Sequence, residues 1–513
     1  MQHLKPVDML NHIRLGLNSL VGGLDSTNKH MPYWSIGFAE GELGAFRHSG
    51  AWDWCHDVAR AIHAIGMAER ATGECVDETI WKDLADLQIA LFDEADNLPG
   101  TADNDTGERF VHLHNIREST HALNGLIRRG DERAREWSRR MIRTVRAALT
   151  DDGAIQLDCL PSYVSEYNHQ PSQEGRAVDA LVRHYRITGD AVALELAGLM
   201  TSYALEHCFT PEGALKEAAG THGHSLNAIV AGMLDLALLT NDTDLLNRVK
   251  AIYDVGCPRF NSSFGWSMES LHKFHPRGES NNTGDLLRAA LLLGHAGWDE
   301  YFEDAERILR GHLLPSQVID VDDLPDDPDE TDDSLHRRAS RLRGGFSFPT
   351  PNDYLLHLDA TIATYDITSG AVDGMCEALA SIITSDAAGV RINLLFSHEA
   401  EGVRLTSHLS QTGRLEIENR SGRPLLVRIP SWVDKQAVCL KVNGVESQKI
   451  FIQSYLLITG NEIPSSSIIT FPMREARTVE SICFENYTID WRGDQIIAMS
   501  PPAKHRPMFP PCE

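Results

Sequence analysis

Two carboxylates and an aromatic ring stand close together in the segment FGWSMESLHKFHPRGESNN, residues 264–282. Glu269 and Glu279 are ten residues apart, and Trp266 precedes both. In carbohydrate sites an aromatic ring stacks on the sugar face, while paired carboxyl groups act on the glycosidic oxygen and the anomeric carbon. These residue types therefore indicate chemistry on a glycosidic bond.

Two further segments place polar side chains directly before apolar helical runs. They are KEAAGTHGHSLNAIVAG (216–232) and CLPSYVSEYNHQPSQEGRAVDAL (159–181). Because three separate segments share this arrangement, we expect their polar side chains to meet around one substrate. The residues expected to contact it are Trp266, His222, Tyr163, Tyr167, Arg176, Arg277 and Asn281.

The position of Glu279 follows from the segment HPRGESNNTGDLLRAALLLG, residues 275–294. Its change from polar to apolar residues predicts a helix that begins near Asp285, with Asn282 or Thr283 as the N-cap. Glu279 then lies just outside the helix N-terminus. The helix dipole favours its ionised form and partial burial opposes it, so its pKa can be tuned for a base or nucleophile.

The elements that must position these residues are predicted by a repeated turn. Helical runs end at Gly73, Gly130, Gly189, Asn241, Gly297 and Gly370. The first four intervals are 57, 59, 52 and 56 residues and the last is 73, lengths that fit two helices and their connections. Six such hairpins predict a closed (α/α)6 barrel with apolar inner helices; an open helical solenoid is the alternative.

The pattern changes to alternating short runs after about residue 388. These runs are VRINLLF, GVRLTSHL, RLEIENR, PLLVRIPSW, AVCLKVNG, SYLLITG and SIITFPM. We therefore expect a barrel domain over residues 1–387 and a β-sandwich over residues 388–513. The proline-rich tail from Trp491 is expected to pack as an irregular strap, and the acidic residues 320–333 as a solvated loop.

Composition narrows the class of partner. The formal charge of -26 argues against nucleic acid and against anionic lipid. No run approaches the roughly 20 apolar residues of a membrane span, and the first residues lack the apolar core of a signal peptide. Nine scattered cysteines without a CxxC pair fit a reducing cytoplasm. A cytoplasmic protein is expected, and a homo-oligomer is compatible with the sequence.

Three stretches are similar to motifs of the β-L-arabinofuranosidase family, glycoside hydrolase family 127 or the DUF1680 group. They are GESNNTGDLLRAALLL, THGHSLNAIVAGMLDLA and, most specifically, PLLVRIPSWVDKQAVCLKVNG. The resemblance implies an (α/α)6 barrel followed by β-sandwich domains, and a glycosidase. It places the family's active-site histidine on His224 and its zinc-binding glutamate on Glu279, with Glu269 as the candidate acid/base.

The sequence departs from this family at the cysteines. Asn281 stands where the family has a cysteine two places after the glutamate, and Cys376 is the one cysteine near the expected position of the nucleophile pair. We therefore expect neither a bound metal nor another cofactor. Two carboxylates are then the simplest machinery, with Glu269 as general acid, Glu279 as base or nucleophile and His224 holding a sugar hydroxyl.

Three functions agree with these residues. The first is hydrolysis of a pentose- or uronate-containing oligosaccharide. The second is a lyase in which His224, Tyr163 or Tyr167 removes a proton next to a uronate carboxylate that Arg176 or Arg277 neutralises. The third is carbohydrate binding without catalysis.

Overall fold

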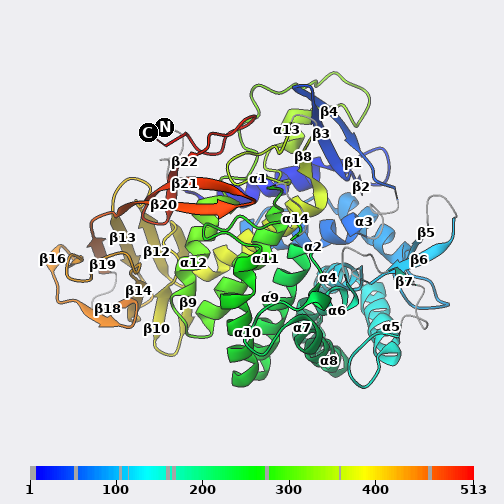
Figure 1. The fold of residues 1–513 in the computed structure, drawn as a ribbon, viewed down its shortest axis with the longest axis horizontal. Coiled ribbons are helices and arrows are strands. Elements are labelled where there is room, and N and C mark those ends of the chain that lie inside the picture. Colours follow the sequence, from blue (N-terminus) through cyan, green and yellow to red (C-terminus); the bar gives the residue numbers. More distant parts are fainter. Residues whose placement is uncertain are drawn as a thin grey trace.

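Six helices form a closed inner ring in the computed structural model, and Figure 1 labels each of them. They are α2 (Val58–Thr72), α4 (Asn115–Arg128), α7 (Val178–Thr188), α9 (Gly223–Thr240), α11 (Ser280–His295) and α14 (Tyr365–Ile382). Each helix contacts the next, and α14 contacts α2, so the ring closes. The predicted (α/α)6 barrel is confirmed, and the open solenoid is excluded. The structure describes residues 7–50, 56–102, 107–113, 115–156, 162–163, 169–271, 276–357, 360–459 and 465–512.

Outer helices cover the inner ring. They are α3 (Glu78–Ala90), α5 (Glu132–Ala148), α8 (Ala191–Cys208), α10 (Thr243–Val255), α12 (Tyr301–Ile308) and α1 (Met9–Gly22), which packs on α14 and α2. The distribution of apolar residues determines whether a helix belongs to the inner or the outer layer. Helix α9 is buried from Gly223 to Ala237 because it is apolar on all sides, whereas α5 buries one stripe and exposes its arginines. Helix α9 has the length and composition of a membrane span, but 83% of that window is buried inside the barrel.

Most of the predicted turns are present. Gly73, Gly189 and Asn241 are left-handed C-caps, with φ of 73°, 72° and 54°. Gly370 is different, because it lies inside α14 and ends no helix. A Cβ placed on Gly370 would lie 2.5 Å from the Cβ of Asn281 in α11. The prediction of a turn there was wrong, since close helix packing requires this glycine.

The chain leaves the barrel at α14 and enters two sheets with strand orders β17-β18-β14-β10-β9 and β11-β12-β13-β19-β15-β16. The strands are β9 (Ile383–Asp386), β10 (Gly389–Ile392), β11 (His398–Ala400), β12 (Val403–Ser407), β13 (Arg414–Asn419), β14 (Leu425–Arg428), β15 (Cys439–Val442), β16 (Val445–Glu446), β17 (Ile450–Ile452), β18 (Tyr455–Ile458) and β19 (Ser465–Thr470). Their inward side chains share one core, as expected of a sandwich. Residue 387, where the barrel domain was predicted to end, lies in the turn between β9 and β10.

A third sheet returns to the barrel. It consists of β20 (Glu475–Ile482), β21 (Glu485–Arg492) and β22 (Gln495–Ser500), and it lies beside α12 and outside the sandwich sheets (Figure 1). Trp491 is therefore part of a strand, and the strap begins only after Ser500. The main-chain amides of Lys504, His505 and Arg506 donate to the Asp353 carboxylate, which holds the strap on the barrel.

Shorter elements connect the barrel helices. They are β1 (Leu24–Asp25), β2 (Met31–Pro32), β3 (Ser35–Ala39), β4 (Glu42–Arg47), β5 (Thr101–Ala102), β6 (Arg109–His112), β7 (Ser162–Tyr163), β8 (Ala360–Thr364), α6 (Gln170–Gly175) and α13 (Arg338–Leu342). The acidic segment 320–333 is largely exposed. Asp327 pairs with Arg338 at 2.7 Å and Asp333 with Arg341 at 3.1 Å, so α13 anchors this segment.

Candidate active site

The inner helices begin at the same end of the barrel, which we call the mouth. It is formed by residues 56–60, 115–118, 176–179, 222–227, 279–285 and 365–369, at the N-terminal ends of these helices. Most of the polar residues here are buried. Helix N-termini carry unpaired amides and a partial positive charge, so the mouth is suited to hold carboxylates.

Glu279 is the N-cap residue of α11, which begins at Ser280 and not near Asp285 as predicted. Glu279 is only 6% exposed, and its Oε2 lies 3.7 Å from Nε2 of His222. Burial raises the pKa of Glu279 to about 8, and the charge of Asp366 acts in the same direction. Glu279 is therefore protonated at neutral pH and can donate a proton. The direction of this shift favours an acid at this position over the predicted base or nucleophile.

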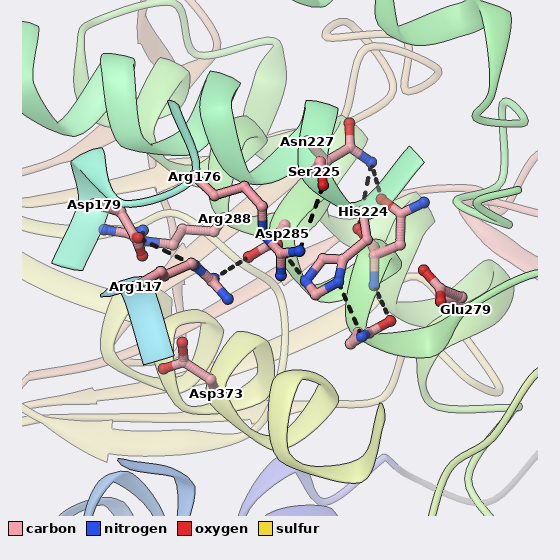
Figure 2. Close-up of polar contacts among 12 residues, drawn as sticks. Arg117, Arg176, Asp179, His224, Ser225, Asn227, Glu279, Asp285, Arg288 and Asp373 are labelled. Carbon is pink, nitrogen blue, oxygen red and sulfur yellow. Dashed lines mark hydrogen bonds and ion pairs between the residues drawn. The ribbon is translucent and has the colours of Figure 1, made fainter. Parts of the chain in front are cut away.

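His224 is held between two side chains of α11 (Figure 2). Its Nε2 lies 3.0 Å from Oδ2 of Asp285, and its Nδ1 lies 3.2 Å from the amide nitrogen of Asn281. Because that amide nitrogen is a donor, Nδ1 accepts and the ring proton is on Nε2, toward Asp285. Burial, together with the nearby arginines, lowers the pKa of His224 well below its ordinary value. The imidazole is thus neutral, with a fixed tautomer.

Asp285 connects this histidine to a chain of buried charged residues, which Figure 2 labels. Its Oδ1 lies 3.4 Å from Nη2 of Arg117, whose Nε lies 3.4 Å from Asp179. Asp179 in turn pairs with Arg288 at 2.8 Å. Burial raises the pKa of Asp285 to about 6, although Arg117 opposes this. The chain fixes the orientation of Asp285 and therefore that of His224.

Glu118 is the centre of a second buried cluster. Its Oε1 lies 2.9 Å from Arg60, 3.1 Å from Arg117 and 3.3 Å from Arg176. Burial alone would raise the pKa of Glu118, but the guanidinium groups hold it well below its ordinary value. Arg176 is only 2% exposed and also donates to the Ser225 hydroxyl at 3.4 Å. It is a buried partner of Glu118, and contact of Arg176 with a substrate stays a prediction.

Glu269 lies in a hairpin beside α9. Its amide donates to the main-chain oxygen of Arg277 at 3.0 Å, and its Oε2 lies 3.1 Å from the Arg277 guanidinium. That guanidinium also stacks 3.9 Å from the ring of Phe348. Glu269 is therefore held in an ion pair with Arg277, and its role as general acid stays a prediction.

Trp266 lies in a core and not on a sugar-binding face. It is 2% exposed, its indole nitrogen donates to the Pro349 carbonyl at 2.9 Å, and it packs in one cluster with residues of β21 and β22. A covered ring cannot stack on a substrate, so this prediction was wrong.

The remaining residues predicted to contact substrate are His222, Asn281, Tyr163 and Tyr167, and the structure describes the side chains of the first two. His222 precedes α9 and its Nδ1 lies 2.8 Å from the Ser225 hydroxyl. Asn281 is buried, and its side-chain amide donates to Nδ1 of His224. Tyr163 is in β7, but its side chain lies outside the described part of the chain, as does the whole of Tyr167.

Asp366 is a site residue that sequence reasoning missed. It is in the first turn of α14, and its Oδ2 lies 3.6 Å from Nε2 of His56. Arg60 donates to its main-chain oxygen at 3.0 Å, and its charge acts on Glu279. Two carboxyl groups therefore interact across the neighbouring helices α11 and α14.

Three residues of the mouth have side chains that could ligate a metal ion. Donor atoms of His222, His224 and Glu279 lie within 4.8 Å of one another. However, Nδ1 of His224 accepts from Asn281 and its Nε2 faces Asp285, and the surrounding arginines disfavour a cation.

The zinc–thiolate set of the resembling family does not fit this chain. Cys376 is buried in α14, eleven residues after Tyr365 and beside Asp373. Burial raises the pKa of its thiol well above its ordinary value, whereas a zinc ligand must be a thiolate.

Known proteins share the fold at low sequence identity. No protein-family model matches the chain, and no curated protein matches it in sequence. A GH127 β-L-arabinofuranosidase from Geobacillus stearothermophilus T6 superposes with a TM-score of 0.61 at 12% identity, over 95% of this chain and 80% of that one. A second GH127 β-arabinofuranosidase gives 0.60 at 15% identity, over 96% and 82%. A sugar epimerase from a ruminal bacterium gives 0.52 at 13% identity, over 73% and 99%.

Proposed function

We propose that the protein is a carbohydrate-active enzyme, a glycoside hydrolase that acts on a pentose- or uronate-containing oligosaccharide. One observation carries the proposal: the buried Glu279, with a pKa of about 8, interacts with the Asp366 carboxylate on the next inner helix. Acid–base cleavage of a glycosidic bond requires two carboxyl groups, one of which donates a proton, and burial raises the pKa of Glu279 in the direction that suits a donor. The fold shared with two β-arabinofuranosidases supports this assignment.

Glu279 is the general acid in this proposal. Its proton passes to the glycosidic oxygen as the bond to the anomeric carbon breaks. Asp366 either attacks that carbon directly or takes a proton from an attacking water. His224 was predicted to hold a sugar hydroxyl, but Asn281 and Asp285 occupy both of its ring nitrogens, so it has a positioning role in this proposal.

The residues of the mouth give less support to the alternative function, a lyase. It requires an arginine that is free to neutralise a uronate carboxylate, and Arg176 is already bound to Glu118. Arg277 is paired with Glu269 at 3.1 Å, although about a third of its side chain is exposed.

Aryl glycosides of pentoses and uronic acids, together with arabinose-containing oligosaccharides, provide the test. We expect release of reducing sugar without the ultraviolet absorbance of an unsaturated uronate. Glu279→Gln and Asp366→Asn should each lower kcat by about 10²–10⁴-fold, while Glu269→Gln should lower it less than tenfold. The acid assignment fails if Glu279→Gln retains kcat within tenfold of the parent. Sugar binding that persists in the variants, with no turnover by the parent, would instead identify a binding protein.

A second candidate is reversible proton transfer at a carbon next to a sugar carbonyl. It is favoured by the imidazole of His222, whose Nε2 lies 3.7 Å from Oε2 of Glu279, and by the fold shared with a sugar epimerase. Incubation of free sugars in deuterated water separates the two functions. An epimerase or isomerase would exchange a carbon-bound proton for deuterium, and a glycoside hydrolase would not.

A further inference from the structure

A second polar cavity lies at the end of the barrel opposite the mouth. Its volume is about 320 Å³, and the C-terminal halves of the inner helices contribute most of its lining. That volume falls in the range of small-molecule sites. The lining contains two acidic residues, Asp235 and Glu377, and a larger number of arginines. These are Arg70, Arg128, Arg183, Arg186 and Arg288.

Three of these arginines are neutralised by carboxylates. Arg183 lies 3.0 Å from Glu377 and 3.7 Å from Asp373. Arg186 and Arg288 share Asp235, at 2.7 and 2.8 Å. Their charges are therefore matched within the protein.

The charges of Arg70 and Arg128 are not neutralised by a carboxylate in this way. Within the described part of the chain, neither forms an ion pair with a carboxylate, and Nη2 of Arg70 lies 2.7 Å from the sulfur of Met67. Burial lowers the pKa of Arg70, and the charge of Arg128 lowers it further. Two like charges thus face one cavity, in a protein whose formal net charge is -26. An anion between them would remove this repulsion.

The floor of the cavity offers a neutral acceptor as well. His121 is 3% exposed and lines the cavity, and its Nδ1 has no hydrogen-bond partner in the described chain. Burial lowers its pKa to about 4, so the ring is neutral. Its Nε2 lies 3.2 Å from the Asp179 carboxylate, so the ring proton is on Nε2 and Nδ1 can accept from a hydroxyl of a bound ligand.

We propose that this cavity binds a small dianion, free phosphate or the phosphate group of a phosphomonoester, between Arg70 and Arg128. Planar guanidinium groups bind phosphate oxygens in pairs and are more weakly hydrated than lysine. The phosphate would lie at the open rim, where both arginines are exposed. Any sugar attached to it would extend toward His121. The site is separate from the mouth and does not depend on the function proposed for it.

Calorimetric titration of the full chain tests the proposal, with inorganic phosphate and with glucose 6-phosphate at constant ionic strength set by chloride. We expect saturable binding by the parent. The double substitution Arg70→Gln/Arg128→Gln should weaken binding at least tenfold. The control, Arg135→Gln/Arg139→Gln on the outer helix α5, removes the same charge from side chains 48% and 55% exposed and should leave binding unchanged.

The outcomes separate the sources of the dianion. Tighter binding of glucose 6-phosphate assigns the phosphomonoester, and equal binding assigns the free anion. No saturable binding by the parent, or an equal loss in both double variants, overturns the proposal. Thermal unfolding in chloride checks the fold, and the Arg70/Arg128 variant should unfold no earlier than the parent because a repulsion has been removed.

Discussion

His224 and Asp285 lie 3.0 Å apart, Nε2 to Oδ2, on the neighbouring inner helices α9 and α11. Asn281, four residues before Asp285, binds the other ring nitrogen. Helix α11 thus fixes both sides of one imidazole, and Glu279 is the residue at its N-cap. A shift of α11 would therefore displace the acid and the imidazole together.

Substitution of Glu279 should change how stability depends on pH. The folded pKa of about 8 exceeds the ordinary 4.5, so the folded state binds the extra proton. The stability contributed by this proton is full below about pH 4.5 and is lost as the pH rises to about 8. Glu279→Gln should match the parent near pH 4.5 and be more stable by roughly 2–5 kcal/mol near pH 9. Denaturant titrations at each pH measure this. Parallel pH profiles for the two proteins would contradict it.

Removal of the Glu118 carboxylate should strongly destabilise the barrel. Glu118→Gln leaves Arg60, Arg117 and Arg176 buried around a neutral amide, and the expected loss is about 3–5 kcal/mol in the free energy of unfolding. The matched control is Glu132→Gln. Its carboxylate is 79% exposed and pairs with Arg135 on the surface of α5, so its loss should change stability by less than about 1 kcal/mol. Similar values for both variants in urea would refute the assigned role of Glu118.

A methyl group at Gly370 should disturb both packing and catalysis. Gly370→Ala places a carbon 2.5 Å from Cβ of Asn281, and we expect a loss of about 1–3 kcal/mol. Because Asn281 binds His224, kcat should fall as well. Gly198→Ala, in the outer helix α8, is the control. No atom lies within 4 Å of its new carbon, so it should stabilise the protein by about 0.5–1 kcal/mol. Equal midpoints of thermal unfolding for the two variants would count against the close contact.

Purified protein is expected to contain no stoichiometric zinc. Asn281 replaces a cysteine of the resembling family, and the Cys376 thiol is buried beside Asp373 rather than at the mouth. Elemental analysis measures the metal directly, and a chelator should leave the midpoint of thermal unfolding unchanged. One equivalent of zinc that survives dialysis would overturn this expectation.

Periodicity in the sequence was sufficient to predict the barrel and the seven strands first identified in the sandwich. It did not predict β20–β22, for a local reason. The two residues between β20 and β21 are Cys483 and Phe484, with φ of 48° and 67°, a conformation usually taken by asparagine and glycine. Strand β20 is also exposed along most of its length, so it lacks the alternation that marks a half-buried strand.

Local sequence was less informative about the site. Glu279 lies at a helix N-terminus as predicted, but its charge state depends on burial by distant segments. Trp266 was taken for a surface ring because its cover, β21 and β22, lies more than two hundred residues further along the chain. Asp366 was overlooked because Gly370 indicated the end of a hairpin, whereas it is an interior position of α14.

The return of β20–β22 to the barrel has a consequence for biosynthesis. Phe264 and Trp266 are completed as a core only when residues 482–509 arrive. At a synthesis rate of about 5–20 residues per second, they wait roughly 10–40 s on the ribosome. The barrel is thus the first part of the chain to be translated, but its packing is completed only after the third sheet has been synthesised. Until then Phe264 and Trp266 are exposed and can be bound by chaperones.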